Sequence, residues 1–560
     1  MKLLFCALIL ILACYSLEVT ANTIKPKAPP VFADSYYAMG LILLPYAEIK
    51  EPFTAFYDKK NGKSRVDYYG DLVKTFQFPT EGDYGVSYKV AYMPDDNGVP
   101  KHTCFQVNGT EDSPVTIQSL LPDISKFKYA GQELCPVEEI YNSEHCEKWE
   151  YTITEGSKVN KYIMWLYRQD NEVVPVRYHM KGYDSLLGSH YDKYDLIYEN
   201  YSAEPIDPIN FEIGESNLTC RAFPGPGVEF ISLHNPAKEF VDGEDKHVQD
   251  AFHNFKNTHN KNYSNDIEHL KRMNIFRHNY RFINSKNRAG LSFKLEVNHL
   301  ADFTDDELWT MRGRLPTTEY NGGEAFDVEL YDRDVPESLD WRLYGAVTPV
   351  KDQAICGSCW SFGTTGTIEG AYFLKTKKLV RLSQQQLIDC SWKFQNNGCD
   401  GGEDYRAYQY IREVGGLATE DDYGPYIGQD GICRDGNVSK TARISSYVNV
   451  TSGDLDALKL AVAYHGPISI SIDASHKSLS FYANGVYYEP ACGNTSDDLD
   501  HSVLAVGYGE LFGEKYWLVK NSWSTYWGND GYFLLSQKDN NCGAATEPTF
   551  VVLTDDTQRR

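Results

Sequence analysis

The chain has 560 residues, which is more than one hydrophobic core usually holds, so we expect several structural units. Its apolar fraction of 42% is typical of a globular protein. With 54 basic and 78 acidic side chains the net charge is −24. Nucleic acid and anionic membrane surfaces repel such a chain, so the composition argues against both as partners.

Residues 1–21 are predicted to be a secretory signal peptide. Lys2 precedes an apolar run from Leu3 to Cys14, and Val19-Thr20-Ala21 is a small-residue cleavage pattern. A buried N-terminal helix is the alternative. The run is too short to span a bilayer, and no later stretch reaches about 18 consecutive apolar residues. We therefore expect a soluble mature protein in the secretory pathway, either lysosomal or secreted.

Export to an oxidising compartment makes the 13 cysteines informative. Cys6 and Cys14 leave with the signal peptide. The others form two groups, Cys104, Cys135, Cys146 and Cys220 in the first and Cys356, Cys359, Cys390, Cys399, Cys433, Cys492 and Cys542 in the second. The first group can pair off in several ways. The second group is odd in number, so one member is a candidate reactive thiol.

Export also makes Asn-x-Ser/Thr sequons candidate glycosylation sites, which would place them on the surface. The sequons are Asn108, Asn200, Asn217, Asn262, Asn437, Asn449 and Asn494.

Residues 22–240 are predicted to form a β-rich N-terminal domain. Stretches rich in Tyr, Val, Ile and Phe alternate with turn clusters, and they are Ser35–Ile49, Arg65–Phe78, Tyr84–Met93 and Lys161–Tyr178. We expect a twisted antiparallel sheet, curved like half a barrel. The domain contains no catalytic cluster and no internal repeat, so chaperone, targeting and ligand-carrier functions all stay open.

A proline- and glycine-rich stretch at 221–243 predicts an exposed linker. It leads into a middle segment, 241–334, that is predicted to be helical over about 246–290. Six residues of that helix recur on one face, namely Glu268, Arg272, Phe276, Asn279, Ile283 and Asn287. Half of this stripe is polar or charged, which indicates a fixed, hydrogen-bonded packing face rather than an ordinary core stripe.

Residues 335–560 are predicted to begin with a helix-rich part, to about Pro425. A strand-rich part follows, with strands at Ile468–Ile472, Ser502–Tyr508, Tyr516–Lys520 and Gly531–Leu535.

The most informative motif of this region is Gln353-Ala354-Ile355-Cys356-Gly357-Ser358-Cys359-Trp360, followed by an apolar, helix-compatible run to Leu374. A cysteine at a helix N-terminus lies at the positive end of the helix dipole, which favours the nucleophilic thiolate. A thioredoxin-type redox pair would need a βαβ context, and a zinc half-site would need a second close Cys or His pair. Neither is present. The Cys-Gly-Ser-Cys-Trp sequence resembles the signature of papain-like cysteine enzymes, and this resemblance implies that Cys359 is a catalytic nucleophile.

A base for such a nucleophile is available downstream. His501 precedes a predicted strand, and Asn521 follows in Lys520-Asn521-Ser522-Trp523. An amide can accept a hydrogen bond from one imidazole N–H and so orient the ring without adding charge. Trp523 would shield that hydrogen bond from water.

These motifs resemble the papain superfamily of cysteine proteases, and within it the cathepsin L-like branch, over about residues 246–554. The resemblance implies an α+β fold, with a helical lobe and a β-barrel-like lobe in the peptidase domain 335–560. It implies Cys359 as nucleophile, His501 as base and acid, and Asn521 as the orienting residue. It also makes Gln353, with the Cys359 backbone N–H, the donor to the oxyanion of the tetrahedral intermediate.

The resemblance implies further structural features. It pairs Cys356 with Cys399, Cys390 with Cys433, and Cys492 with Cys542, which leaves Cys359 free. The six-residue stripe matches the inhibitory propeptide helix of this branch, so 241–334 is expected to be an inhibitory propeptide. In the family, the chain after that helix crosses the active-site cleft in the reverse sense to substrate, and the prosegment is lost in acid.

The sequence departs from the family pattern at three positions. Glu296 and Leu300 replace the usual Gly and Phe in a second prosegment motif, in which Asn298 and Asp302 remain. Ser524 stands where relatives usually carry Gly, which would be strained if that position needs a positive φ.

The family resemblance also locates the pocket for the second residue before the scissile bond. Gly402 maps to the partner of the substrate backbone, and Asp404 and Glu547 give the pocket an acidic wall and floor. We expect it to take Arg or Lys as well as Phe or Leu, because a carboxylate in a partly buried pocket attracts a cation. The alternative is that Glu547 points into water. Trp523 completes the expected substrate-binding residues.

The resemblance favours a broad endopeptidase acting on proteins and peptides, restrained by its own propeptide, with neither cofactor nor metal. An exopeptidase would need a blocked cleft, and no paired-histidine insertion occurs in 335–560. A non-catalytic relative would lack the nucleophile. The layout of the whole chain resembles the two-chain cysteine proteinase precursor of insect haemocytes, which suggests that an N-terminal chain is retained after processing.

Overall fold

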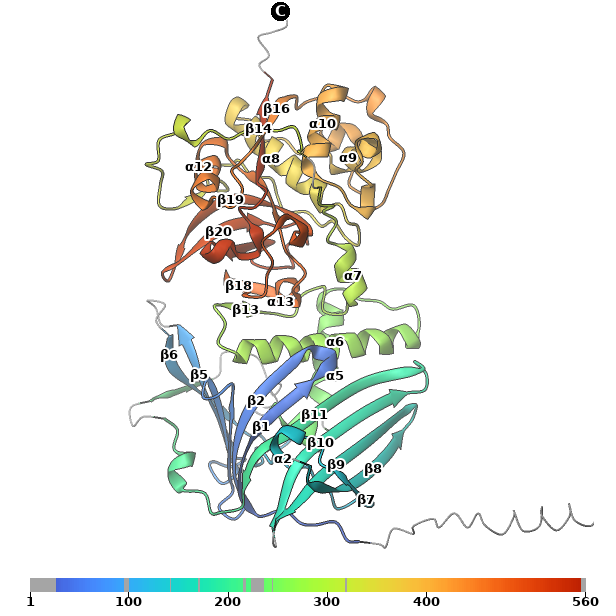
Figure 1. The fold of residues 1–560 in the computed structure, drawn as a ribbon, viewed down its shortest axis with the longest axis vertical. Helices are drawn as coiled ribbons and strands as arrows, with labels where there is room; N and C mark the ends of the chain where they lie inside the picture. The colour runs from blue at the N-terminus through green and yellow to red at the C-terminus, as the bar shows by residue number, and fades with distance from the viewer. Residues whose placement is uncertain are drawn as a thin grey trace, which may run out of the picture.

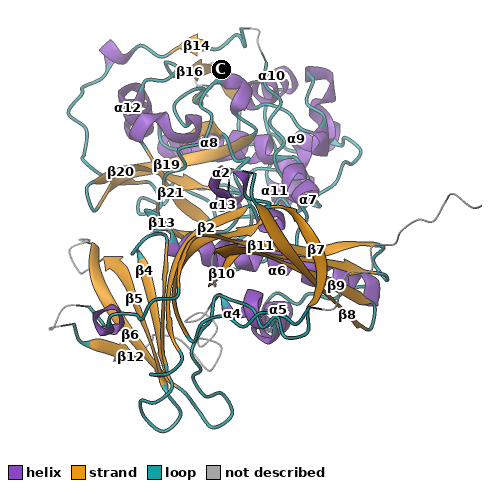
Figure 2. Cartoon of the chain, turned by 60° about the horizontal axis from the view of Figure 1, so that its bottom comes forward, coloured by secondary structure: helices purple, strands orange, loops and turns teal. Residues whose placement is uncertain are grey.

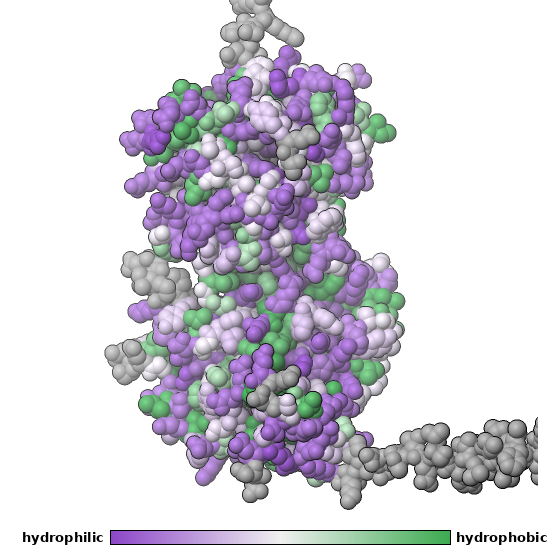
Figure 3. All heavy atoms as spheres, viewed as in Figure 1, coloured by the Kyte–Doolittle hydropathy of each residue, from purple (hydrophilic) through white to green (hydrophobic). Residues whose placement is uncertain are grey.

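The computed structural model describes residues 27–94, 100–141, 143–169, 172–214, 218–222, 236–243, 245–317 and 320–554. The predicted signal peptide, most of the predicted linker and the sequon at Asn217 lie outside the described residues. Figure 1 shows a β-rich N-terminal part below, the C-terminal part above, and the middle segment between them. The face in Figure 3 is mostly hydrophilic over all three parts.

The N-terminal part is one twelve-stranded sheet with the order β12-β6-β5-β4-β3-β2-β1-β11-β10-β9-β8-β7. Neighbouring strands are antiparallel except β12 and β6, and Figure 2 shows the strong curvature of the sheet, which agrees with the predicted curved antiparallel sheet. The strands are β1 (Ser35–Leu44), β2 (Ile49–Asp58), β3 (Lys63–Tyr68), β4 (Val73–Phe78), β5 (Val86–Pro94), β6 (Pro100–Asn108), β7 (Lys128–Leu134), β8 (His145–Glu155), β9 (Lys158–Gln169), β10 (Glu172–Asp184), β11 (Ser189–Ser202) and β12 (Cys220–Ala222). A short helix, α2 (Glu138–Tyr141), precedes β8.

Local turns divide the stretches that the composition suggested as strands. Arg65–Phe78 contains two strands, because Tyr69 and Gly70 adopt positive φ angles of 53° and 78° and reverse the chain. Two disulfides secure the sheet, Cys104–Cys220 between β6 and β12 and Cys135–Cys146 at the β7–β8 end. They resolve the pairing of the first cysteine group.

The middle segment contains α4 (Lys238–Asp242), α5 (Lys246–Thr258), α6 (Asp266–Arg288), β13 (Phe293–Leu295), α7 (Asp305–Thr310) and β14 (Glu324–Ala325). The prediction that about 246–290 is helical is therefore confirmed, and the segment consists of two helices, α5 and α6. Asn260 adopts a positive φ of 51° and ends the first helix, and the Asn265 side chain then caps α6 by accepting from the Glu268 N–H.

The six-residue stripe of α6 has the predicted role of a hydrogen-bonded packing face. Arg272 contacts Glu268 at 2.6 Å and Glu307 of α7 at 2.6 Å. Asn279 donates to the Ala301 carbonyl at 3.0 Å, and Asn287 holds both the N–H and the carbonyl of Leu295. Each of these polar side chains thus binds a later part of the middle segment to the helix.

The C-terminal part has a helical lobe and a β lobe. Its helices are α8 (Cys359–Thr376), α9 (Gln384–Cys390), α10 (Asp404–Val414), α11 (Glu420–Tyr423), α12 (Leu455–His465) and α13 (Lys477–Ser480). Its strands are β15 (Leu339–Asp340), β16 (Ile444–Asn449), β17 (Ile468–Ile472), β18 (Tyr482–Tyr487), β19 (His501–Leu511), β20 (Glu514–Lys520), β21 (Tyr532–Ser536) and β22 (Thr549–Leu553). The middle segment adds β13 and β14 to this sheet. Among the described residues, no helix is long and apolar enough to cross a bilayer.

Candidate active site

Cys359 is the first residue of α8, so its thiol lies at the positive end of an 18-residue helix. Its side chain is completely buried, and it is the free cysteine of the described chain. The preceding residues are fixed by the Cys356–Cys399 disulfide. The other bridges are Cys390–Cys433 and Cys492–Cys542, so the three pairs are those that the resemblance implies.

His501 and Asn521 lie together at the ends of neighbouring strands. His501 begins β19 and Asn521 follows β20, and the distance from His501 Nε2 to Asn521 Oδ1 is 2.8 Å. Because an amide oxygen accepts, Nε2 carries the proton, and the other ring nitrogen has no hydrogen-bond partner among the described residues. The Trp523 ring covers the imidazole, with centroids 4.7 Å apart.

Gln353 is completely buried beside this group. Its amide oxygen accepts from Ser522 Oγ at 2.6 Å. Its Nε2 donates to the carbonyl of Met311 at 2.7 Å and to that of Cys356 at 2.7 Å. The predicted oxyanion donor is therefore occupied by a main-chain carbonyl of the middle segment.

Residues 311–315 of the middle segment form a covering strand across the site, in which Arg314 makes an isolated β-bridge with Gly402. The Gly313 N–H points at Cys359 Sγ at 3.3 Å, and the Gly313 carbonyl accepts from the Gly402 N–H at 2.8 Å. Leu315 N–H donates to the Gly402 carbonyl at 3.1 Å, and the pairing with Gly402 is parallel. No sequence motif indicated Gly313, whose lack of a side chain is required here. A Cβ at this position would lie 1.8 Å from the Gly357 oxygen.

This covering strand changes the protonation of the site. Burial raises the pKa of the Cys359 thiol to about 11, although the helix N-terminus and the Gly313 N–H favour the thiolate. Burial also lowers the pKa of His501 to about 4, against the stabilising effect of Asn521. Both groups are therefore neutral around neutral pH while the strand is in place, and the thiolate expected from the helix dipole is not favoured in this state.

The predicted acidic pocket is filled by Arg314 of the same strand. Its guanidinium contacts Glu547 and, at 3.3 Å, Glu403, and it donates to the Leu499 carbonyl at 2.9 Å. Its side chain is 2% exposed. The predicted pocket residue Asp404 is half-buried beside them and accepts from Thr549 Oγ1 at 2.5 Å. Burial raises the pKa of Glu403, which precedes Asp404 in the sequence, to about 7.

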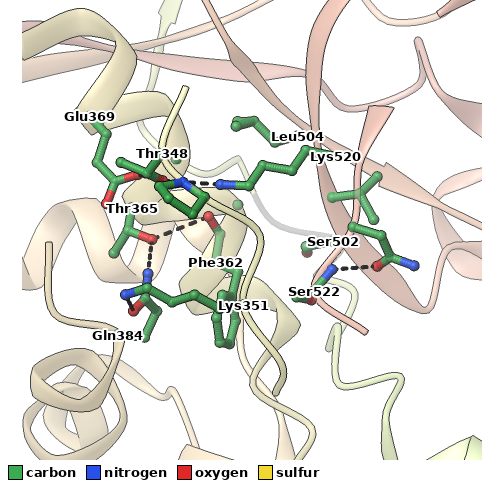
Figure 4. Close-up of a pocket in the computed structure, with 15 residues that line it drawn as sticks. Thr348, Lys351, Phe362, Thr365, Glu369, Gln384, Ser502, Leu504, Lys520 and Ser522 are labelled. Carbon is green, nitrogen blue, oxygen red and sulfur yellow. Dashed lines mark hydrogen bonds between the residues drawn. The ribbon is translucent and has the colours of Figure 1, made fainter. Parts of the chain in front are cut away.

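Asn521 and Ser522 also line a cavity of about 20 Å³ between the two lobes. Figure 4 shows the polar groups around it, with Lys520 pointing toward Thr348 and Gln384 toward Thr365. Glu369 of α8 accepts from Thr348 Oγ1 at 2.7 Å. Through Thr348, these contacts join Glu369 of α8 to Lys520 of β20, the strand that Asn521 follows.

The sequons differ in accessibility. Asn449 is half-buried, and its amide donates to Asn321 of the middle segment at 2.7 Å. The other described sequons are exposed, and they are Asn108, Asn200, Asn262, Asn437 and Asn494.

Two family models match the chain. One, described as "Papain family cysteine protease", matches residues 335–552, and the other, "Cathepsin propeptide inhibitor domain (I29)", matches residues 252–308. Both matches lie C-terminal to the twelve-stranded sheet. They cover the candidate catalytic residues and the α6 helix.

Similar proteins agree with these matches. A "Cathepsin L-like peptidase" of Aedes aegypti is 45% identical over 317 residues, which are 53% of this chain and 91% of that protein. "Cathepsin L2" of Homo sapiens is 41% identical over 315 residues, which are 55% of this chain and 93% of that protein. The solved structure of digestive procathepsin L2 from the larval midgut of Tenebrio molitor is 35% identical, with a TM-score of 0.51. It covers 55% of this chain and 100% of that one. The chain therefore belongs to the papain family of cysteine proteases, as a cathepsin L-like peptidase that carries an inhibitory propeptide.

Proposed function

We propose that the protein is an endopeptidase that hydrolyses peptide bonds through Cys359, His501 and Asn521. One observation supports this most. The main chain of the propeptide lies over Cys359 Sγ and makes, at Gln353 and Gly402, hydrogen bonds that a bound peptide substrate would use. The site is thus built to hold an extended peptide over the thiol.

In the proposed reaction the unpartnered imidazole nitrogen of His501 takes the proton from the Cys359 thiol. The thiolate attacks the carbonyl carbon, and the oxyanion accepts hydrogen bonds from Gln353 Nε2 and the Cys359 N–H. The imidazolium then gives its proton to the leaving amine as the peptide bond breaks. Water, deprotonated by the same imidazole, hydrolyses the thioester and regenerates the thiol.

The test is the peptidase activity of the processed protein with an internally quenched peptide blocked at both ends. Cys359→Ala should lower kcat/KM by at least about 10⁴-fold, and Asn521→Ala should leave measurable activity. Cleavage of a doubly blocked peptide distinguishes an endopeptidase from an exopeptidase. Full activity of Cys359→Ala would disprove the mechanism.

We also propose that the substrate pocket accepts a basic side chain at the second position before the scissile bond. The burial of Arg314 against Glu403 and Glu547 supports this, because the pocket already accommodates a guanidinium. Glu547→Gln should lower the ratio of kcat/KM for Arg over Phe substrates by about tenfold. Glu413→Gln, an exposed carboxylate on α10, is the matched control. An unchanged ratio in Glu547→Gln would refute the assignment.

For the whole chain we propose processing at the predicted borders after residues 21, 240 and 334. The protein would act in the secretory pathway, in a lysosome or after secretion, and its propeptide would be released in acid. Retention of an N-terminal chain is part of the same proposal. Intact-mass measurement before and after acidification tests the borders.

A further inference from the structure

A second stripe on α6 faces away from the peptidase. Arg277, Arg281, Ser285 and Arg288 are spaced four, four and three residues apart, which places them on one face of the helix. This face differs from the Glu268-to-Asn287 stripe. All four side chains are nine-tenths or more buried.

Arg281 makes the most extensive contacts of this second stripe. Its guanidinium donates to both carboxylate oxygens of Asp192 on β11, at 2.7 and 2.9 Å. It also donates twice to Glu239 of α4, at 2.8 and 2.6 Å. The three side chains are 5%, 2% and 7% exposed, so water screens these pairs little.

The next turns of α6 contact the other half of the sheet. Arg288 donates to both oxygens of Glu51 on β2, at 2.6 and 2.8 Å. Ser285 donates to the same carboxylate at 2.8 Å and contacts the Tyr69 hydroxyl. The partners of this arginine face therefore lie on β2 and β11, which flank β1 in the sheet, and on α4.

The opposite side of α6 and the strand that follows contact the peptidase differently. Phe282 packs near Phe481, and β13 pairs with β18. Asn298 donates to the Ser480 carbonyl at 2.8 Å. Figure 1 shows α6 lying between the sheet and these peptidase elements. The helix is thus held by apolar and main-chain contacts on one side and by buried ion pairs on the other.

We propose that the N-terminal sheet is a receptor for the inhibitory helix, and that it keeps the precursor latent by holding α6 through Asp192 and Glu51, with Glu239 of α4 as a further partner of Arg281. The physical reason is the cost of an unpaired buried charge. An arginine buried on this face is stable only while its carboxylates remain beside it. The N-terminal unit thereby has a function. Its binding of α6 does not depend on the proposed peptidase activity, whereas its effect on latency rests on that proposed activity.

The test uses the full-length chain with Cys359→Ala, which cannot process itself. Asp192→Asn and Glu51→Gln, singly and together, remove charge without changing shape. Hydrogen exchange of the α6 amides, residues 266–288, should accelerate by at least about tenfold in the double variant. The matched control is Glu147→Gln, a buried carboxylate of the same sheet that pairs with Arg168 and not with α6. Exchange within α8 should not change.

Unchanged α6 exchange in the double variant would overturn the proposal. If that variant does not fold, Arg281→Lys is the alternative. It keeps the positive charge but loses the planar guanidinium that donates to two carboxylates, and it should still accelerate hydrogen exchange of the α6 amides. With Cys359 present, the double variant should also release active peptidase sooner, with the kcat/KM of the mature enzyme unchanged. If the parent shows no Cys359-dependent activity, the proposed function fails while the exchange result still decides the role of the sheet.

Discussion

At the scale of single residues, Gly313 shows how the propeptide reaches the Cys359 thiol without a side chain. Gly313→Ala should displace the covering strand, because its Cβ would meet the Gly357 carbonyl. We expect Cys359 of the precursor to react at least about tenfold faster with iodoacetamide, since an uncovered thiol regains thiolate character. Gly436→Ala is the control, because a Cβ there meets open space. An unreactive Gly313→Ala precursor would argue against this role of the glycine.

Ser524 is a second residue with a measurable effect. Its φ of 71° lies in the left-handed region, so the strain anticipated from the sequence is present. Ser524→Gly should raise the free energy of unfolding by up to about 1 kcal/mol, because the relief of strain exceeds the added entropy of the unfolded chain. Ser524→Ala keeps the strained backbone and should give no gain. Thermal unfolding of both variants checks this, and a lower melting temperature for Ser524→Gly would contradict it.

At the scale of elements, the turn after α5 and the loop after β13 bring two histidines to the peptidase. His259 and His299 both lie against Tyr526, with ring centroids 5.2 and 6.1 Å away. Burial, followed by Lys261 and His259, lowers the pKa of His299 to about 3. Burial also lowers the pKa of His259, as does Lys261, while Asp302 raises it.

These shifts predict how acid affects the propeptide. A free histidine takes up a proton near pH 6.5, whereas docked His299 does not do so until about pH 3. The docked state therefore loses stability as the pH falls below about 6.5, and acid favours release. His299→Gln should move the activation midpoint to lower pH by about 0.5 unit. The exposed His145→Gln should not move it, and an equal shift in both variants would refute the histidine effect.

The elements also show which parts of the molecule could be predicted from sequence. The stripe from Glu268 to Asn287 was predictable because its helical spacing is visible in the sequence. Its partners lie at most 35 residues further along the chain. The arginine face was missed because its carboxylates, such as Glu51, lie more than two hundred residues upstream and no local pattern identifies them. Arg314 was missed for the same reason, since its partner Glu547 follows at a separation of 233 residues.

At the scale of the whole molecule, the inhibitory helix lies between two bodies that recognise its two faces. The peptidase part was predictable in detail, because Cys359, His501 and Asn521 stand in distinctive motifs. The N-terminal sheet was predictable only as a curved antiparallel sheet, since alternation of residues specifies strands but not their order across twelve positions. Its contact with α6 emerged only from the structure.

The central claim is that Cys359 is a nucleophile masked by the propeptide. Its most direct test is intact-mass analysis after treatment with iodoacetamide, before and after acid processing, alongside peptide hydrolysis. The account predicts no modification of Cys359 in the precursor, and one carboxamidomethyl group on Cys359 with complete loss of activity in the processed enzyme. Activity that survives full modification of Cys359 would contradict it.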